Sequence, residues 1–344
     1  MKRYYMCVFL LLCSVILFAQ TDLPRKYVIQ RSAQPVDVDG KLEDLAWSGA
    51  KWTETFGDIE GDINPHPYYD TQVKLTYDDD YLYVGAYLED THIWASQTKK
   101  NTAIFNFDCA FELFLDPDGD HVNYYEFQAN PLNTIWELSL PKPYRANPKA
   151  TNPDNIEGLK TATHVYHTIN DPSDQDSLWS IEMAIPWSGL EKYYGQALPP
   201  QSGSIWRMNL ARVQWGAEIE DGQYFKLEED SNLYWTWSPH AEINLHTPEY
   251  WGYLIFDKEP LQFEEDLLLD QERRLLLMEA FQIQKNYYRK MGTYNPDLST
   301  WQMDTLSLMF EFKDDGYLIT DQRSGLSNCY TNQDSRFWCD DVIR

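Results

Sequence analysis

Alternating apolar and polar residues, interrupted by turn-forming residues, recur along most of this chain. In residues 81–88 the aliphatic side chains at positions 82, 84, 86 and 88 alternate with three tyrosines and a glycine. This two-residue period is typical of a β-strand with one face on a core. Residues 72–77 precede it across the acidic turn 78–80, so the two segments are predicted to form a hairpin.

The same pattern is densest in residues 111–138. Three aromatic-rich runs, 111–115, 124–129 and 134–138, are separated by two segments rich in Asp, Gly, Asn and Pro. Such residues favour tight turns, so we expect three consecutive antiparallel strands. Further strands are predicted at residues 161–167, 178–185, 205–215, 234–237 and 251–256, an edge strand at 35–40, and a helical turn around Trp47. About ten strands without long helices predict a mainly β fold, an antiparallel two-sheet sandwich of jelly-roll type.

The pattern changes after Lys258. Residues 264–291 contain no proline and have a helical period, with Gly292 as a plausible stop. Short strands are expected at residues 306–312, 316–320 and 335–339. We therefore expect a sandwich over residues 28–257 and a helix-plus-strands appendage over residues 258–344. The apolar stripe predicted to contact the last segment comprises Leu269, Leu276, Ala280, Ile283, Tyr287 and Met291.

The first residues resemble an export signal. Lys2 and Arg3 precede an apolar run over residues 6–19, which is too short to span a bilayer. We predict a signal peptide at residues 1–19 and a periplasmic, cell-surface or secreted location. In such an oxidising setting Cys329 and Cys339 are candidates for a local disulfide, whereas Cys109 is expected to be a small buried apolar residue.

Composition narrows the classes of partner. The chain has 344 residues with a formal charge of −26, which argues against nucleic acid and against anionic membrane surfaces. It also has 13 Trp and 24 Tyr. Core packing explains most of these rings, but a surplus also suits a surface that stacks on sugars, because the ring faces are apolar and the ring edges are polar.

One turn has the residues of an ion site. Asp116, Asp118 and Asp120 alternate in the first turn of the central stretch, and Glu126 follows on the next run. Several carboxylates at this spacing are typical ligands of a hard cation such as calcium. The alternative is a solvated type I turn with Pro117 at its second position. We expect a structural calcium ion, because carboxylates this close repel one another when nothing neutralises them.

An ordered set of short motifs resembles the family 9 carbohydrate-binding modules of exported bacterial proteins. The resemblance covers about residues 28–257. The motifs are residues 35–40 with Trp47, 81–84, 111–117, 125–127 with Asn130, 179–187, 206–209, 237–239 and 251–252. It implies a β-sandwich related to the DOMON superfold, a structural calcium ion, and sugar binding in a shallow cleft.

The resemblance also implies roles for individual residues. Glu112 matches a strand carboxylate that accepts hydrogen bonds from sugar hydroxyls, Gln128 falls where relatives tend to have a basic side chain, and Asn130 matches an Asn. The resemblance places the two tryptophans that clamp the sugar in relatives near Phe105 or Asn106, and near Leu245. Trp94, Trp136, Tyr144 and Trp215 are candidates for a different aromatic platform. The candidate sugar-binding residues are therefore Trp94, Phe105, Glu112, Gln128, Asn130, Trp136, Tyr144 and Arg145.

The resulting hypothesis is an exported, non-catalytic carbohydrate-binding protein that assists polysaccharide binding or breakdown. A glycosidase is not supported, since among 54 acidic residues some pair would meet a catalytic spacing by chance. Haem binding through Met183 or Met208 is less favoured than core filling by both. The alternative from another class is a cell-envelope structural or interaction module that kept the fold and lost the sugar, with a protein partner at the C-terminal appendage.

Overall fold

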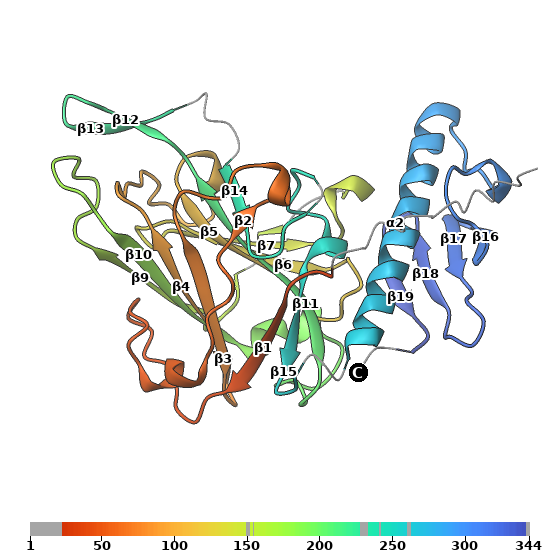
Figure 1. The fold of residues 1–344 in the computed structure, drawn as a ribbon, viewed down its shortest axis with the longest axis horizontal. Coiled ribbons are helices and arrows are strands. Elements are labelled where there is room, and N and C mark those ends of the chain that lie inside the picture. The colour runs from red at the N-terminus through yellow and green to blue at the C-terminus, as the bar shows by residue number, and fades with distance from the viewer. Residues whose placement is uncertain are drawn as a thin grey trace, which may run out of the picture.

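The computed structural model describes residues 23–148, 152–153, 155–227, 233–240, 242–259 and 263–341, with only the backbone described at 152. The predicted signal peptide lies outside these residues. Two β-sheets form one body, and a long helix with a small four-stranded sheet forms a second unit beside it (Figure 1). The mainly β fold with one long helix near the C-terminus is therefore confirmed. No described helix has both the length and the apolar character needed to cross a membrane.

The first sheet, called sheet I here, contains the central strands. Its spatial order is β8 (Asn152–Pro153), β7 (Ile135–Leu140), β6 (Tyr124–Ala129), β5 (Ala110–Asp116), β11 (Ile205–Gln214), β15 (Gly252–Phe256) and β1 (Lys26–Arg31). β14 (Leu233–Thr236) pairs with β11 and with the short β2 (Gly57–Asp58). The three consecutive strands expected in the central stretch are thus confirmed as β5, β6 and β7.

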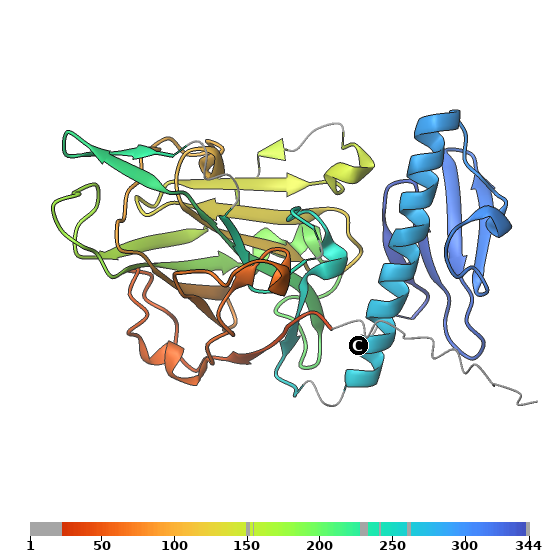
Figure 2. The ribbon, with the colours of Figure 1, turned by 45° about the horizontal axis from the view of Figure 1, so that its top comes forward.

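The second sheet, sheet II, packs against the first. Its order is β1, β3 (Thr71–Tyr77), β4 (Tyr81–Glu89), β10 (Leu178–Pro186) and β9 (Lys160–Tyr166). β1 joins the two sheets, because its first four residues pair in parallel with β15 and its last two residues pair in parallel with β3. Both sheets are strongly twisted around each other (Figure 2). The hairpin predicted across residues 78–80 is β3–β4.

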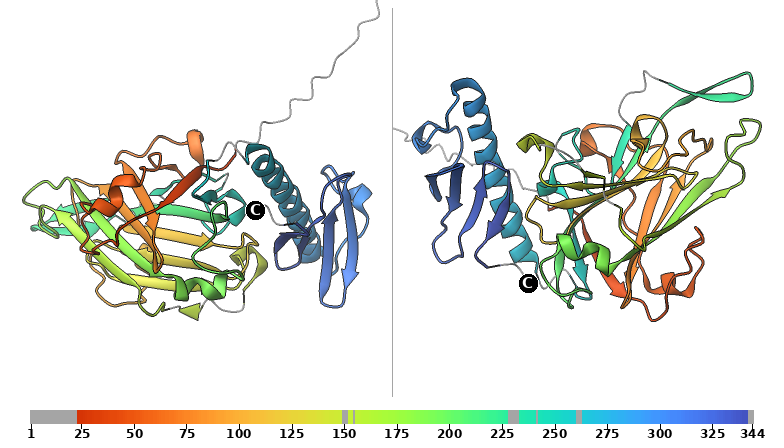
Figure 3. Two further views of the ribbon diagram at one scale, coloured as in Figure 1. Left: turned by 90° about the horizontal axis from the view of Figure 1, so that it is seen from below. Right: turned by 180° about the vertical axis from the view of Figure 1, so that it is seen from behind.

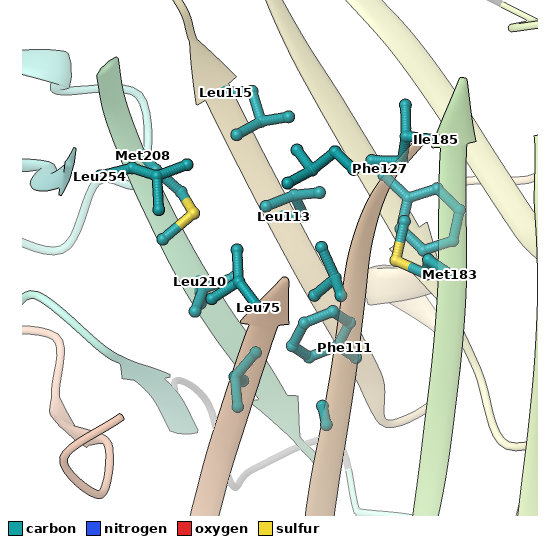
Figure 4. Packing of buried hydrophobic residues seen from close by; sticks show 14 of the residues in the cluster. Leu75, Phe111, Leu113, Leu115, Phe127, Met183, Ile185, Met208, Leu210 and Leu254 are labelled. Carbon is teal, nitrogen blue, oxygen red and sulfur yellow. The ribbon is translucent and has the colours of Figure 1, made fainter. Parts of the chain in front are cut away.

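The core lies between the inner faces of the two sheets. Alternate residues of β5, namely Phe111, Leu113 and Leu115, are fully buried there, as are the aliphatic residues of β4 at 82, 84, 86 and 88. Met183 and Met208 fill this core, as predicted (Figure 4). Burying one such side chain stabilises the fold by about 1.5–3 kcal/mol. The alternation of the sequence therefore decides which face of each strand turns inward.

Residues 35–40 do not form the predicted edge strand. The backbone N–H groups of Asp39 and Gly40 both donate to Glu182 Oε2 at 2.9 Å, and Trp47 Nε1 donates to Glu182 Oε1 at 2.8 Å. A carboxylate therefore replaces a neighbouring strand as hydrogen-bond partner. Gly40 has a φ of 91°, and an added Cβ would lie 2.6 Å from a backbone carbon of Thr163. The helical turn predicted around Trp47 is confirmed as the 3₁₀ helix Leu45–Gly49.

The C-terminal unit is built on α2 (Glu264–Met291), which has the predicted bounds. Three acidic residues stand in its first turn, and Gly292 ends it with a φ of 71°. The helix lies between the sandwich and the small sheet (Figure 3). That sheet has the order β16 (Leu308–Lys313), β17 (Gly316–Asp321), β18 (Cys329–Asn332) and β19 (Phe337–Cys339). Cys329 and Cys339 form a disulfide, and Cys109 is buried and free, as expected.

The predicted apolar stripe of α2 is confirmed for three of its members, because Leu276, Ala280 and Ile283 pack in or against the hydrophobic cluster of the C-terminal unit. Only Ala280 among them is buried, and Met291 is 62% exposed. The buried face is shifted around the helix and includes charged side chains: Leu267, Asp270, Gln271, Arg273, Arg274, Leu277, Met278, Ala280, Phe281 and Gln284. Arg273 and Arg274 are buried because they pair with Asp321 and Asp270 at 2.6 and 2.7 Å. Hydrophobic periodicity does not detect a face that buries ion pairs.

Candidate functional site

The outer face of sheet I carries the polar residues that alternate with the core. On β5 the outward-facing residues include Glu112 and the apolar Phe114, and on β6 they include Glu126 and Gln128. Glu112 lies opposite Gln128, and Phe114 lies opposite Glu126. Because successive side chains of a strand point to opposite faces, these four residues share one surface. They form the floor of a cleft.

The cleft has a volume of about 330 Å³. Its walls come from neighbouring strands β7 and β14, from the 3₁₀ helices Ile104–Asn106 and Tyr144–Ala146, and from the loop before β15. The described residues that line it are Ile59, Phe105, Glu112, Phe114, Glu126, Gln128, Trp136, Tyr144, Tyr234, Ile243, Asn244, Leu245 and His246. A cleft of this size, with many apolar and a few polar walls, is typical of a small-molecule site.

Aromatic rings dominate two of the walls. Phe105 and Trp136 are stacked, with ring centroids 6.0 Å apart and an interplanar angle of 9°. Tyr144 meets the ring of His246 edge to face at 4.5 Å. Trp136 reaches the cleft because it lies opposite Gln128 on β7. A flat ligand would therefore meet a pair of parallel rings close to the carboxylates of the floor.

Two buried carboxyl groups face the same space. Glu112 is 1% exposed and Glu126 is 3% exposed. The Oε2 atom of each has no hydrogen-bond partner among the described residues. Burial raises the pKa of Glu126 to about 7, although Gln128 Nε2 donates to its Oε1 at 2.9 Å. Burial, with the charge of Glu126, raises the pKa of Glu112 well above its usual range. Both groups have spare capacity for hydrogen bonds to a ligand.

The one imidazole in the described lining does not supply a charge. His246 Nε2 lies 3.9 Å from Glu126 Oε2, and its Nδ1 is 2.9 Å from the hydroxyl of Tyr124. Burial lowers the pKa of His246 to about 3, so the ring is neutral at physiological pH. No Lys or Arg is among the cleft-lining residues in the described part of the chain. The cleft therefore offers hydrogen-bond acceptors and ring faces, with no fixed cation.

The structure brings together five of the eight predicted sugar-binding residues. Phe105, Glu112, Gln128, Trp136 and Tyr144 all line the cleft. Leu245, at the second position where relatives place a clamping tryptophan, lines it as well. These residues come from segments far apart in the sequence, and the register of sheet I places them around one opening.

The other three predicted residues lie elsewhere. Trp94 is buried and does not line the cleft. Asn130 holds a turn, because its Nδ2 donates to Gln97 O at 2.8 Å and to Asp108 Oδ2 at 2.7 Å. Arg145 points away towards the C-terminal unit, where it pairs with Glu249 and donates to Ser335 Oγ at 2.7 Å.

Several lining residues were not predicted. Phe114 could have been found from its strand alternation with Glu112, and Tyr234 begins a predicted strand. The segment 243–246 had no signal beyond the position of Leu245. Glu126, predicted to help hold a metal, lies at the cleft floor, because its place on β6 sets it opposite Phe114.

The acidic turn after β5 forms a separate cluster. One carboxylate oxygen from each of Asp116, Asp118 and Asp120 lies within 4.8 Å of the others. Asp116 accepts hydrogen bonds from the backbone N–H groups of Gly119 and His121, at 3.1 and 2.9 Å. Burial raises the pKa of Asp118 to about 6, with the charge of Asp120 adding to the effect. The three groups are thus destabilised as anions unless positive charge is nearby.

That charge comes partly from the C-terminal unit. Arg336 Nε pairs with Asp120 Oδ2 at 2.8 Å, and Arg274 Nη1 donates to the carbonyl oxygen of Gly119. Phe337 N donates to Asp120 O at 2.9 Å, so β19 is hydrogen-bonded to the turn directly. The acidic turn is therefore also the surface on which the C-terminal unit docks.

A twisted β-sandwich with an aromatic, carboxylate-bearing cleft on one sheet defines a ligand-binding module of the sandwich class. The carbohydrate family 9 binding domain-like model matches residues 38–255, which is more than half of the chain. The protein therefore belongs to the carbohydrate family 9 binding domain-like family. The resemblance on which the site residues were predicted is confirmed at the level of the family.

Part of this chain is also similar to solved structures at low sequence identity. A candidate carbohydrate-binding protein from Bacteroides uniformis has a TM-score of 0.49 and 14% identity, covering 68% of this chain and 100% of that chain. A family 9 carbohydrate-binding module from Caldicellulosiruptor kristjanssonii in complex with cellotriose has a TM-score of 0.43 and 16% identity, covering 68% and 95%. The same kind of module in complex with glucose scores 0.42 at 16% identity, covering 68% and 97%. No curated protein matches this chain.

Proposed function

We propose that this chain is an exported, non-catalytic carbohydrate-binding protein that assists polysaccharide binding or breakdown. The observation that carries the proposal is the cleft on sheet I. There the stacked pair Phe105 and Trp136 stands beside Glu112 and Glu126, whose buried oxygens lack partners. Sugars present flat apolar faces to aromatic rings and donate hydroxyl hydrogens to carboxylates. Membership of a carbohydrate-binding family supports this reading.

Sugar binding through the stacked rings leads to a first prediction. Replacing Trp136 by alanine is expected to weaken binding of a neutral gluco-oligosaccharide by about tenfold or more, because an aromatic anchor in a cleft carries much of the binding energy. Trp52→Ala is the matched control, since Trp52 is 37% exposed and lies outside the cleft. Isothermal titration calorimetry measures both. Equal affinities for the two variants would contradict the role of the cleft.

The second candidate is an envelope interaction module that kept the fold and lost the sugar. It is favoured by one observation: none of Phe105, Asn106 and Leu245, where the resemblance places the two clamping tryptophans, is a tryptophan. Titration of the wild-type protein with a panel of glycans decides between the two. A wild-type protein that responds to no plant, algal or host glycan would favour this candidate, with the C-terminal unit as the partner surface.

Export is proposed from the predicted leader and supported by the disulfide. Cys329 and Cys339 are bonded across the neighbouring strands β18 and β19. Disulfides persist in oxidising compartments such as the periplasm and the cell surface. A periplasmic, cell-surface or secreted location is consistent with a polysaccharide ligand.

We also propose that Asp116, Asp118 and Asp120 hold a structural calcium ion. The donor set fits, since three carboxylates can converge on one point and calcium prefers oxygen ligands. Arg336 already pairs with Asp120, so the ion would share that carboxylate with a guanidinium. When bound, the ion would supply charge that fixes the turn and, through it, the end of β5.

Calcium is therefore expected to raise the melting temperature of the chelator-treated protein. A ligand at 100 times its dissociation constant stabilises a folded protein by about 2.7 kcal/mol. Asp118→Asn is expected to abolish most of the rise. Asp79→Asn, in the acidic turn between β3 and β4, is the control, because Asp79 is not in the cluster. Differential scanning calorimetry with and without calcium checks this, and an equal rise in both variants would refute the assignment.

A further inference from the structure

The electrostatic state of the cleft points to a particular kind of sugar. Glu112 and Glu126 are diagonal neighbours on β5 and β6, and both face the cleft. A buried carboxylate is unfavourable unless a cation or several donors accompany it. Inside this protein neither group has a cationic partner among the described residues that line the cleft. The missing charge would have to come from the ligand.

Nearby basic groups are already engaged elsewhere. Arg145 follows Tyr144 in the sequence, but it is paired with Glu249 beneath the C-terminal unit. Lys226 donates to the carbonyl oxygen of Asn106 at 2.6 Å and lies over the ring of Trp215 at 3.5 Å, outside the cleft lining. His246 is neutral. The described walls thus hold two buried carboxyl groups and no basic side chain that could serve as their counter-charge.

We infer that the cleft binds a sugar with a free amino group, a hexosamine unit in its ammonium form, in preference to a neutral or N-acetylated sugar. This rests on the proposed function and adds the chemical class of the sugar. An ammonium group has three donors, which can reach the partnerless oxygens of Glu112 and Glu126. The faces of Phe105 and Trp136 attract a cation through their ring quadrupoles and pack on the sugar ring.

Proton release on binding gives a second measure of the contact between the ammonium group and the two glutamates. The titratable side chains that line the cleft in the described residues are Glu112, Glu126, Tyr144, Tyr234 and His246. Burial raises the pKa of Glu126 to about 7 and the pKa of Glu112 well above its usual range, so both groups hold their protons to higher pH than an exposed glutamate does. An ammonium ion favours the carboxylate form, so binding releases protons. A neutral sugar only exchanges hydrogen bonds, and it is expected to release none.

The test uses the full mature chain and three probes of equal length: β-1,4-linked tetramers of glucosamine, N-acetylglucosamine and glucose. Calorimetry is performed at slightly acidic pH, where the amine is charged, in two buffers that differ in ionisation enthalpy. We expect the glucosamine tetramer to bind about tenfold more tightly than the other two, since charge-assisted hydrogen bonds are the strong ones. We also expect net proton release with this probe alone.

Two variants separate site binding from general attraction to an acidic protein. Glu112→Gln keeps the shape of the floor, and it is expected to remove the preference for glucosamine over the glucose tetramer, measured as the ratio of the two dissociation constants. Glu220→Gln changes an exposed residue of β12 (Ala217–Glu220), and it is expected to leave the preference intact.

Each outcome has a distinct meaning. Equal binding of all three tetramers, or preference for the neutral ones, would overturn the inference and leave carbohydrate binding standing. Glucosamine binding that both variants weaken alike would reduce the effect to surface charge and also overturn it. Binding of none of the tetramers would count against the inference and against the proposed function together.

Discussion

Replacing Arg212 with methionine is expected to lower the free energy of unfolding by about 3–5 kcal/mol, because it would leave a buried carboxylate without its cation. Arg212 is fully buried beside the core of the sandwich. Its Nη2 donates to Gln214 Oε1 at 2.6 Å and lies 3.2 Å from Asp90 Oδ2. The guanidinium also packs over the ring of Trp235 at 5.1 Å.

The pH dependence of the free energy of unfolding gives a second measure of the effect of Arg212→Met. Burial raises the pKa of Asp90, while Arg212 opposes the rise. Without Arg212 the pKa of Asp90 in the folded state would rise further above its unfolded value. A group with a raised pKa stabilises the fold while protonated and loses this contribution as pH increases. The defect of Arg212→Met is therefore expected to shrink as pH falls towards the ordinary range of Asp.

Urea unfolding followed by tryptophan fluorescence measures the change. Arg31→Met is the matched control, because Arg31 forms an exposed ion pair with Asp79, and such pairs contribute little. The double variant Arg212→Met with Asp90→Leu removes both charges, so it is expected to be more stable than Arg212→Met alone. A loss of unfolding free energy in Arg212→Met no larger than in Arg31→Met would show that Arg212 does not offset the cost of burying Asp90.

Much of the sandwich could be predicted because its signal is local. The period of two in residues 81–88 and the turns on either side of β5 and β6 do not depend on distant residues. The same alternation places Glu112 and Gln128 on one face of sheet I, whereas their expected role in sugar binding came from the resemblance to a family. Phe105 and Leu245 required the resemblance to a family.

The remaining site residues depend on how loops and units meet. Arg145 immediately follows Tyr144, yet only Tyr144 lines the cleft, because the 3₁₀ helix turns Arg145 towards Glu249. Asn130 has a sugar-binding residue type but satisfies the backbone of its own turn. The polar residues on the buried face of α2 were not predicted for a related reason, since contacts with two separate surfaces allow polar residues to be buried there. A sequence pattern shows the hydrophobic period within one strand or helix. The positions of these residues depend instead on contacts between segments that are distant in the sequence.

Arg274→Met is expected to release the C-terminal unit from the sandwich without unfolding the two sheets. Arg274 reaches from α2 into the acidic turn: it pairs with Asp270 at 2.7 Å, donates to Gly119 O, and lies 3.0 Å from His121 Nε2. Its guanidinium also lies over the ring of Phe337 at 4.1 Å. The substitution would leave a buried carboxylate and two buried acceptors without this partner, at a cost of about 3–5 kcal/mol.

Hydrogen exchange followed by mass spectrometry locates the effect. Amide protection in β19 and in the first half of α2 is expected to fall by about a hundredfold or more, whereas protection in β4 and β10 is expected to remain. Arg289→Met, at the exposed end of the same helix, is the matched control. A uniform loss across both sheets would show that the two units unfold together, and unchanged protection in β19 would show that Arg274 does not hold the junction.

The contact between the C-terminal unit and the acidic turn is also expected to affect calcium binding, because both involve Asp120. Arg336 and calcium would compete for Asp120, while Arg274 leaves the carboxylates of the cluster free and binds the backbone of the turn. If Arg274→Met opens the junction, Arg336 loses its fixed position, and calcium becomes the main counter-charge of the three aspartates. The stabilisation by calcium is therefore expected to be larger in Arg274→Met than in the wild type, because only the ion then offsets their mutual repulsion. An equal or smaller calcium effect in the variant would show that Arg336 and the ion do not share Asp120.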